Sequence, residues 1–358
     1  MMTTIPTTIL GGAMLPHAPQ FFTQPDTEDK AAIARVQSVA RTIGDRLKAL
    51  QPDLWIVIAN DHAQQFFHQC APPFTLHVGA EARGNFAGRA FHYKVAGDTG
   101  LALIRALYDE GFDPAFSSTA EIDYALGIPM THLGLTLEHR VLPVYVNAYL
   151  PPQPTMQRCY AFGQAVARSL TLLGVRAVVV ASGGMSHFPG TEQYANPNLA
   201  FDQSVLEPLR SGRLKSLAGY SEKTLDHTGN IELRCWAVAA GALGDRAPDI
   251  VQMDPSWHHN YASLGWWSPP VANPAPHYPS IDPALVPLTA AIHGLAHDPA
   301  ERKLFIENPA AYLRKHRIDE QHATMLLALD MRAMTAAGVH PLVPFLARMQ
   351  VERDRTSR

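Results

Sequence analysis

The sequence predicts an α/β fold, a sandwich of helices around a largely buried central sheet, followed by a small all-helical C-terminal domain. Short runs of apolar and β-branched residues indicate buried strands, and stretches with helical spacing lie between or after them. Strands that alternate with helices are typical of this fold class. With 358 residues, 47% of them hydrophobic and 17% charged, the chain can bury a sizeable core.

The strands and helices are expected to alternate along the first two thirds of the chain. The apolar runs predict strands over residues 7–14, 54–59, 141–146 and 175–181. Apolar residues at helical spacing predict helices over residues 30–50, 100–110, 156–173 and 227–243.

A change of composition near residue 268 indicates a domain boundary. Prolines crowd the following segment, and proline is excluded from helix interiors and central strands. We therefore expect a larger α/β domain over residues 1–268, a Pro-rich linker over 269–287 and a helical domain over 288–358. Helix ends within that domain are indicated by Asn308 with Pro309 and by Gly338 with Pro341.

Charge and cysteine content narrow the possible partners and the compartment. The net charge is -3 and no dense run of Lys or Arg occurs, so neither nucleic acid nor an anionic membrane is an expected partner. The first basic residue is Lys30, and no apolar run is long enough to span a bilayer, which favours a cytoplasmic protein. Cys70, Cys159 and Cys235 are widely spaced and odd in number, and we expect them to be buried thiols.

Three histidines follow predicted strands directly. His17, His62 and His187 come after strand candidates, each beyond a turn that contains glycine or an Asn-Asp pair. Ligand sites in α/β sheets gather outside the carboxyl ends of the strands. If these strands are parallel, the three side chains converge.

Coincidence is the competing interpretation, because the chain has 17 histidines and most histidines are surface or core residues. We assign that ordinary role to the histidines of the tail and to His68, His77, His92, His139, His258 and His259. The shared position at strand ends sets His17, His62 and His187 apart from these.

Glu232 is the best candidate for a carboxylate ligand beside the histidines. Two histidines and one carboxylate can take one face of iron(II) and leave the other open. Glu232 lies in an otherwise apolar predicted helix. A cap or an ion pair with Arg234 explains Glu232 equally well on spacing alone.

Four segments resemble, in order and spacing, the LigB-type class III extradiol ring-cleavage dioxygenases. The resemblance implies that Fe(II) is held by His17, His62 and Glu232, and that O2 opens the ring of a catechol-type diol such as protocatechuate or gallate. It also implies that His187 acts as general base and then acid. The matching segments are residues 14–19, 60–62, 184–190 and 229–232.

The C-terminal domain is similar to the small α subunit of protocatechuate 4,5-dioxygenase, here fused to the catalytic part. The resemblance implies that this domain is a lid over the active site. A plain stabilising or dimerising domain is the alternative. The matching segments are residues 302–305, 308–313, 326–330 and 338–341.

The chain departs from the family pattern at Tyr124, which stands where a histidine is usual. Either Tyr124 or His132 supplies a hydrogen bond to the substrate, or the substrate does not need one, which leaves room for a dihydroxypyridine. Asp61 and Ser186 are further candidates for substrate contacts. For Asp61, a capping role in its turn is equally favoured.

A ring carboxylate would need a cation, for which Arg83, Arg89 and Lys94 are candidates, although solvent-facing charge is their commoner role. Two other classes of function compete with the dioxygenase. One is a zinc-dependent hydrolase that uses the same ligands, and the other is a binding protein on this fold without catalysis. A homodimer is the expected assembly.

Overall fold

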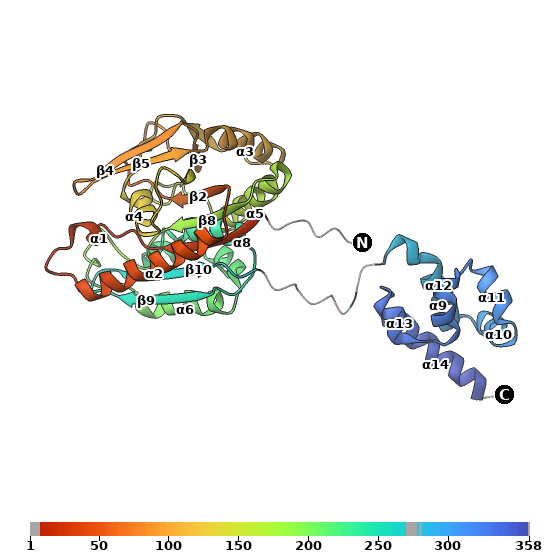
Figure 1. Ribbon diagram of the computed structural model, residues 1–358. Coiled ribbons are helices and arrows are strands. Elements are labelled where there is room, and N and C mark those ends of the chain that lie inside the picture. The colour runs from red at the N-terminus through yellow and green to blue at the C-terminus, as the bar shows by residue number, and fades with distance from the viewer. Residues whose placement is uncertain (1–7, 270–277, 279–280, 357–358) are drawn as a thin grey trace. The chain divides into compact units, whose positions relative to one another are not determined.

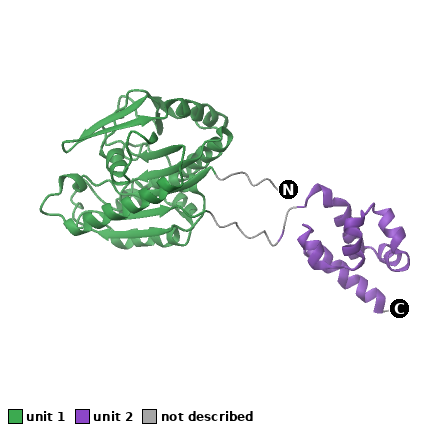
Figure 2. Ribbon diagram, viewed as in Figure 1, with its two compact units in different colours: residues 1–271 green, residues 272–358 purple. Residues whose placement is uncertain are grey.

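The computed structural model describes residues 8–269, 278 and 281–356. It divides into two compact units, residues 1–271 and 272–358 (Figure 2). Two apolar clusters lie in the first unit and a separate cluster lies in the second, so each unit has a core of its own.

The first unit is built on a mixed sheet with the order β4-β5-β7-β2-β8-β1-β10-β9, in which β3 and β6 extend from β7 (Figure 1). Four central strands are parallel: β1 (Ile9–Leu15), β8 (Ala177–Ser182), β2 (Leu54–Ala59) and β7 (Arg140–Val146). The remaining strands are β3 (Phe74–His77), β4 (Glu81–Phe86), β5 (Arg89–Val95), β6 (Ala115–Ser117), β9 (Ile250–Pro255) and β10 (Asn260–Trp266).

Helices cover both faces of this sheet, because the central strands are apolar on both sides. Alternate residues of β2 belong to different apolar clusters: Ile56 and Ile58 lie on one face, and Trp55 and Val57 on the other. The first face is covered by α3 (Gly97–Asp109), α5 (Met156–Leu173) and α8 (Leu233–Leu243), and the second by α2 (Lys30–Ala49) and α4 (Tyr124–His132).

The shorter helices of the first unit connect these elements. They are α1 (Gln20–Thr23), α6 (Leu199–Arg210), η1 (Leu214–Gly219) and α7 (Glu222–Thr228). Helices α5 and α8 pack unusually closely. A Cβ atom at Gly163 would lie 1.9 Å from the carbonyl oxygen of Val238, and one at Gly241 would lie 2.0 Å from that of Tyr160. This contact fixes the position of α8.

The α/β prediction is confirmed, and the predicted strands and helices differ from the observed ones in several respects. The helix expected over residues 227–243 is broken, because Gly229 adopts a left-handed conformation (φ 69°) that ends α7 before α8 begins. Sequence reasoning also missed β3, β4, β5, β6, β9 and β10, each of which is short, partly exposed or interrupted by polar residues. It did not identify α1, α4, α6 or η1 either.

The second unit is helical, as predicted. It contains η2 (Pro283–Leu285), α9 (Val286–His297), α10 (Pro299–Glu307), α11 (Pro309–Lys315), α12 (Glu320–Leu327), α13 (Met331–Ala336) and α14 (Leu342–Thr356). Asn308 caps α11 by accepting a hydrogen bond from Ala311 N, and Gly338 has a φ of 107° after α13. Both predicted helix ends are therefore confirmed.

The predicted linker over 269–287 falls partly on residues 270–277 and 279–280, which lie outside the described part of the chain. Its last five residues are helical, which corrects the prediction there. Pro283 and Pro287 occupy first-turn positions of η2 and α9, where proline needs no hydrogen-bond donor of its own.

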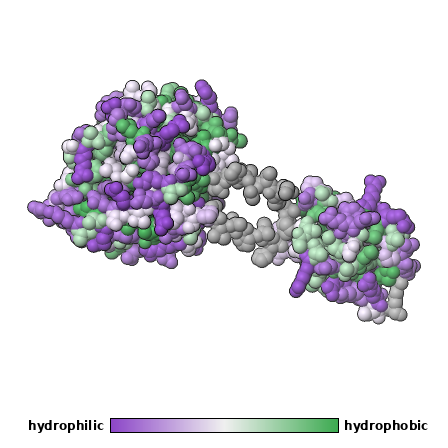
Figure 3. Space-filling model, in the orientation of Figure 1, coloured by the Kyte–Doolittle hydropathy of each residue, from purple (hydrophilic) through white to green (hydrophobic). Residues whose placement is uncertain are grey.

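The cysteine prediction is only partly right. Cys159 and Cys235 are buried, but Cys70 is exposed in the loop between β2 and β3. Hydrophilic and apolar side chains are interspersed on the face of each unit shown in Figure 3. Among the described residues, no helix has the length and apolar character that a membrane crossing requires.

Candidate metal and substrate site

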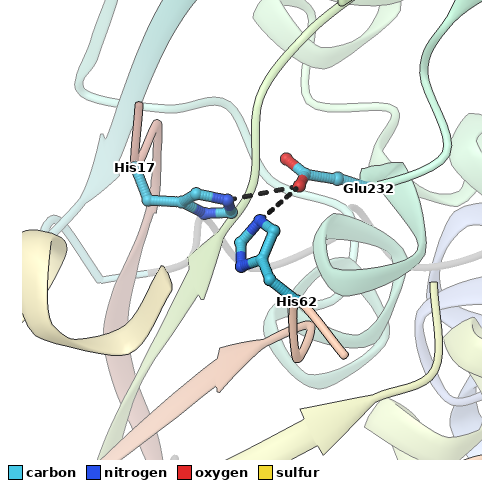
Figure 4. Close-up of side chains that lie close together, drawn as sticks. All are labelled: His17, His62 and Glu232. Carbon is cyan, nitrogen blue, oxygen red and sulfur yellow. Dashed lines mark ion pairs between the residues drawn. The ribbon is translucent and has the colours of Figure 1, made fainter. Parts of the chain in front are cut away.

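Three side chains from distant parts of the first unit meet at the carboxyl edge of the parallel strands (Figure 4). His17 follows β1, His62 follows β2, and Glu232 immediately precedes α8. Glu232 Oε1 lies 3.2 Å from His17 Nε2 and 3.8 Å from His62 Nε2. Two ligands at right angles on a metal, with bonds of about 2.1 Å, stand about 3 Å apart, so the spacing suits one shared ion.

Glu232 is held so that one carboxylate oxygen points at both imidazoles. Its other oxygen, Oε2, accepts a hydrogen bond of 2.5 Å from Gly184 N, and Tyr149 donates its hydroxyl to Oε1 at 2.9 Å. Gly184 must be glycine here, because a Cβ atom would lie 1.9 Å from His259 Nε2. The backbone hydrogen bond from Gly184 N thus holds Oε2 and leaves Oε1 directed at the imidazoles.

The tautomers of both histidines follow from their partners. Ser182 donates its hydroxyl to the carbonyl of Ala125 at 2.5 Å, so Ser182 Oγ must accept from His17 Nδ1 at 2.8 Å. His62 Nδ1 lies 2.7 Å from a carboxylate oxygen of Asp123 and donates to it. In each neutral ring the lone pair is then on Nε2, the atom that faces Glu232.

The charges of the cluster are mutually dependent. Burial opposes ionisation of Glu232, but the imidazoles of His17, His187 and His62 outweigh it and hold the pKa of Glu232 well below its usual range. Burial also opposes protonation of His62, yet the Asp123 carboxylate raises the pKa of His62 above its usual value. A fully buried carboxylate faces three imidazoles, an environment that suits a divalent cation.

His187 lies beside these three residues but does not belong to the group of side chains that could hold one metal ion. Its Nε2 is 3.8 Å from Glu232 Oε1 and 3.4 Å from the Tyr149 hydroxyl. Its Nδ1 donates to the carbonyl of Met185 at 2.9 Å, so a neutral His187 has its basic lone pair on Nε2. The ring stacks on His259, with centroids 4.4 Å apart and planes within 1° of parallel.

A cavity of about 440 Å³ opens beside the cluster. Aromatic rings and small apolar side chains form most of its wall. The lining residues are His17, Ala18, Pro19, Gln20, His62, Ala63, Tyr124, Tyr149, Leu150, His187, Pro189, Tyr194, His258 and His259. A cavity of this size holds a small aromatic molecule.

The structure brings some of the predicted substrate residues to the cavity and leaves others away from it. Tyr124 lines the cavity and stacks on His62, with ring centroids 4.2 Å apart. His132 does not line it; its ring packs on Phe21 and Phe22, and burial lowers its pKa to about 4. Of the two candidates for a hydrogen bond to the substrate, only Tyr124 therefore lines the cavity.

Asp61 and Ser186 have structural partners instead. The Asp61 carboxylate accepts hydrogen bonds from the backbone of Gln64, Gln65 and Phe66, the capping role that the sequence left open. Ser186 is fully buried and donates its hydroxyl to Asp202 at 2.6 Å. Neither residue lines the cavity.

The candidate cations for a ring carboxylate lie outside the cavity lining as well. Arg83 pairs with Glu81 at 2.6 Å on an exposed hairpin, and the Arg89 guanidinium lies over the ring of Phe22. Lys94 is exposed on β5.

Sequence reasoning assigned no role to Asp123, Ser182 and Tyr149, which orient the three candidate ligands. For Asp123 a signal was available, because it directly precedes Tyr124 where the resemblance implies an Asp-His pair. His258 and His259 were assigned ordinary roles, although both line the cavity from the turn between β9 and β10. That the two histidines are adjacent in the sequence was the only sign of this.

Comparisons with known proteins agree on one family. The family described as the catalytic LigB subunit of aromatic ring-opening dioxygenase matches residues 11–265. A 2,3-dihydroxyphenylpropionate/2,3-dihydroxicinnamic acid 1,2-dioxygenase of Cupriavidus necator is 29% identical over 302 residues, covering 70% of this chain and 96% of the relative. A protein of the same name from Cupriavidus pinatubonensis is 29% identical over 303 residues, with the same coverage.

Among solved structures, an uncharacterized protein from Escherichia coli K12 matches with a TM-score of 0.49 and 13% identity. The match covers 72% of this chain and 99% of that protein.

Replacing Asp123 by Asn should weaken divalent-metal binding about 10–100-fold, the usual effect of losing a residue that orients a ligand. The Asn oxygen can keep the α4 cap to Ala125 N. The NH2 group then faces His62 Nδ1 and donates to it, so the ring proton moves to Nε2 and the lone pair there is lost. Metal titration of the purified variant measures this.

Asp61→Asn is the matched control, since that side chain also adjoins His62 but bonds only to loop backbone. Equal metal affinity of Asp123→Asn and Asp61→Asn would contradict the orienting role of Asp123.

Proposed function

The chain belongs to the LigB family of catalytic subunits of aromatic ring-opening dioxygenases, and on that basis we propose that it opens the ring of a catechol-type diol at iron(II). In this proposal His17, His62 and Glu232 hold the iron and O2 is the second substrate. The observation that supports it most is the convergence of two imidazole lone pairs on one carboxylate oxygen. Hydrogen bonds at Nδ1 of each ring fix both tautomers.

The donor set fits iron(II) because two neutral imidazoles and one carboxylate leave coordination positions open on the cavity side. Bound iron(II) would supply Lewis acidity at the diol oxygens and the redox chemistry that O2 requires. The cavity then restricts the diol to one orientation, since the rings of Tyr124 and Tyr149 line its wall beside His62. Holding reactants in place in this way lowers the entropic part of a barrier.

His187 is the proposed proton acceptor for the diol hydroxyl. Its Nδ1 proton is committed to the Met185 carbonyl, so the incoming proton must go to Nε2, on the side of Glu232 and Tyr149. The same atom can later return the proton to the opened product. Tyr124 can donate a hydrogen bond, but its burial and the nearby carboxylates of Glu232 and Asp123 raise its pKa, so it is no base at neutral pH.

The substrate proposed from the sequence, a protocatechuate-like or gallate-like diol, has a dihydroxypyridine as its alternative. The named relatives are dioxygenases of 2,3-dihydroxyphenylpropionate. All of these molecules share the vicinal diol on which the proposed chemistry depends. A homodimer stays a prediction.

Each of His17→Ala, His62→Ala and Glu232→Ala should abolish stoichiometric iron binding while the fold persists, because each removes one of three ligands. Anaerobic reconstitution with iron(II), followed by iron analysis, circular dichroism and oxygen uptake with catechol, checks this.

Zinc reconstitution of the wild-type protein is the control for the rival hydrolase, which would be active with zinc and without O2. Full iron content and oxygen uptake in all three alanine variants would refute the ligand assignment.

His187→Ala should keep its iron and its affinity for the diol but lose about 10²–10⁴-fold in kcat, the usual effect of removing a general acid–base group. Steady-state oxygen uptake at pH 7 measures the loss. His68→Ala, which removes an exposed histidine of the loop between β2 and β3, is the control. Turnover of His187→Ala close to the wild-type value would eliminate this role.

For the second unit, we propose the lid function that its resemblance to a small dioxygenase subunit implies. Its separate core supports folding as a distinct body. Leu342, Phe345 and Met349 are each about half exposed and share one side of α14, at spacings of three and four residues. Apolar surface of this kind is suited to cover another surface.

A chain that ends at Pro269 tests the lid. It keeps both cores of the first unit and the bonds of Ser268 to Asp249, so it should fold and bind iron. We expect a higher KM for the diol and faster oxidative inactivation, because closed sites exclude water and stray oxidants. Unchanged kinetics in that folded protein would show that the helical unit is not a lid.

A further inference from the structure

One wall of the cavity contains a buried histidine, hydrogen-bonded to a carboxylate, that the proposed reaction does not use. His258, 2% exposed, lines the cavity and places Nε2 3.0 Å from Glu28 Oε1. The same carboxylate accepts hydrogen bonds from Trp257 Nε1 at 3.1 Å and from the Tyr261 hydroxyl at 3.4 Å. Glu28 therefore accepts from three donors, two in the turn of the β9–β10 hairpin and one near the beginning of β10.

This arrangement fixes which nitrogen of His258 is free. Because Glu28 accepts, His258 Nε2 carries the proton, and the lone pair of the neutral ring lies on Nδ1. Among the described residues, none hydrogen-bonds to that Nδ1. Burial lowers the pKa of His258, which favours the neutral ring. The side chain thus offers the cavity an acceptor rather than a charge.

The neighbouring side chains on this wall leave His258 Nδ1 as its acceptor. Gln20 lines the cavity and donates from Nε2 to the hydroxyl of Tyr194 at 3.4 Å, but its Oε1 is buried and does not face the cavity. Tyr194 in turn stacks on His258, with ring centroids 5.2 Å apart. An unpaired acceptor in a desolvated wall, as His258 Nδ1 is, favours a ligand that brings a donor.

The same wall opposes a carboxylate. Within the described catalytic unit no Lys or Arg side chain lines the cavity, so no guanidinium or ammonium is placed to bind an anion there. The charge nearest to His258 is the negative Glu28. An anionic substituent beside His258 would meet the lone pair of Nδ1, with the Glu28 carboxylate on the other side of the ring.

We propose that the preferred diol is uncharged outside its two metal-binding oxygens and presents a neutral hydrogen-bond donor, an N–H or a third O–H, to His258 Nδ1. This inference rests on the proposed function and narrows its substrate class. Hydroxypyridones supply the N–H, and pyrogallol-type rings supply the O–H. The carboxylated side chain in the named relatives' substrate is then not what this cavity selects.

Matched pairs of substrates test the inference in the full-length, iron-loaded protein. Pyrogallol is compared with 3-methylcatechol, which has the same bulk without the donor, and 3-hydroxy-4-pyridone is compared with its N-methyl derivative. Protocatechuate is compared with its uncharged amide. We expect kcat/KM to be about 10-fold or more higher for the donor in at least one of the first two pairs, and higher for the amide than for the acid.

The variant His258→Phe keeps a planar ring but removes the acceptor, and it should reduce the donor preference to within about twofold. Iron content and circular dichroism establish that the variant is folded; if it is not, the wild-type ratios decide alone. Pairs with equal kcat/KM, faster opening of protocatechuate than of its amide, or an undiminished preference in His258→Phe would each overturn the inference. Ring opening of every diol at equal rates would do so while leaving the proposed function intact, whereas no ring opening of any diol by the iron-loaded protein would refute both.

Discussion

The buried carboxylate of Glu232 is the constraint around which the catalytic unit is organised. An ionised carboxylate with no exposed surface is costly unless hydrogen bonds and positive charge compensate it. Gly184 N and the Tyr149 hydroxyl supply hydrogen bonds, and the imidazoles of His17, His62 and His187 face its free oxygen. A divalent ion held by this oxygen and by the Nε2 lone pairs of His17 and His62 would compensate the buried charge directly, which is the electrostatic reason for a metal to belong there.

The fold meets this constraint largely through the position of the backbone around Glu232. Glu232 stands at the beginning of α8, and the close contact of α8 with α5 at Gly163 and Gly241 leaves that helix no freedom to shift. Gly229 ends α7 and, through its carbonyl, accepts a hydrogen bond from His187 N at 3.0 Å. The break between the two helices thus ties the backbone of His187 and the carboxylate of Glu232 to one short segment.

Much of this arrangement could be predicted from the sequence, because it follows from local pattern. Apolar β-branched runs gave the parallel strands, and the geometry of a parallel sheet then placed His17, His62 and His187 at one edge. The orienting groups could not be found in that way. Asp123 and Ser182 reach the histidines from elements that only the tertiary fold brings near, and a helical period does not show a break such as that at Gly229. His258 was hidden among many histidines, in the turn of a hairpin whose strands were too short or too polar to be recognised.

The β9–β10 hairpin has a consequence for how this site can diversify. The groups that converge on Glu232 come from the parallel strands and α8, whereas His258 and its partners Trp257 and Tyr261 belong to the antiparallel hairpin that ends the sheet beside β1. A turn between strands tolerates change better than the strands do, but this one also holds His259, which stacks on His187 and lies against Gly184. A replacement at His258 therefore alters the cavity wall, whereas one at His259 also disturbs the residues around Glu232.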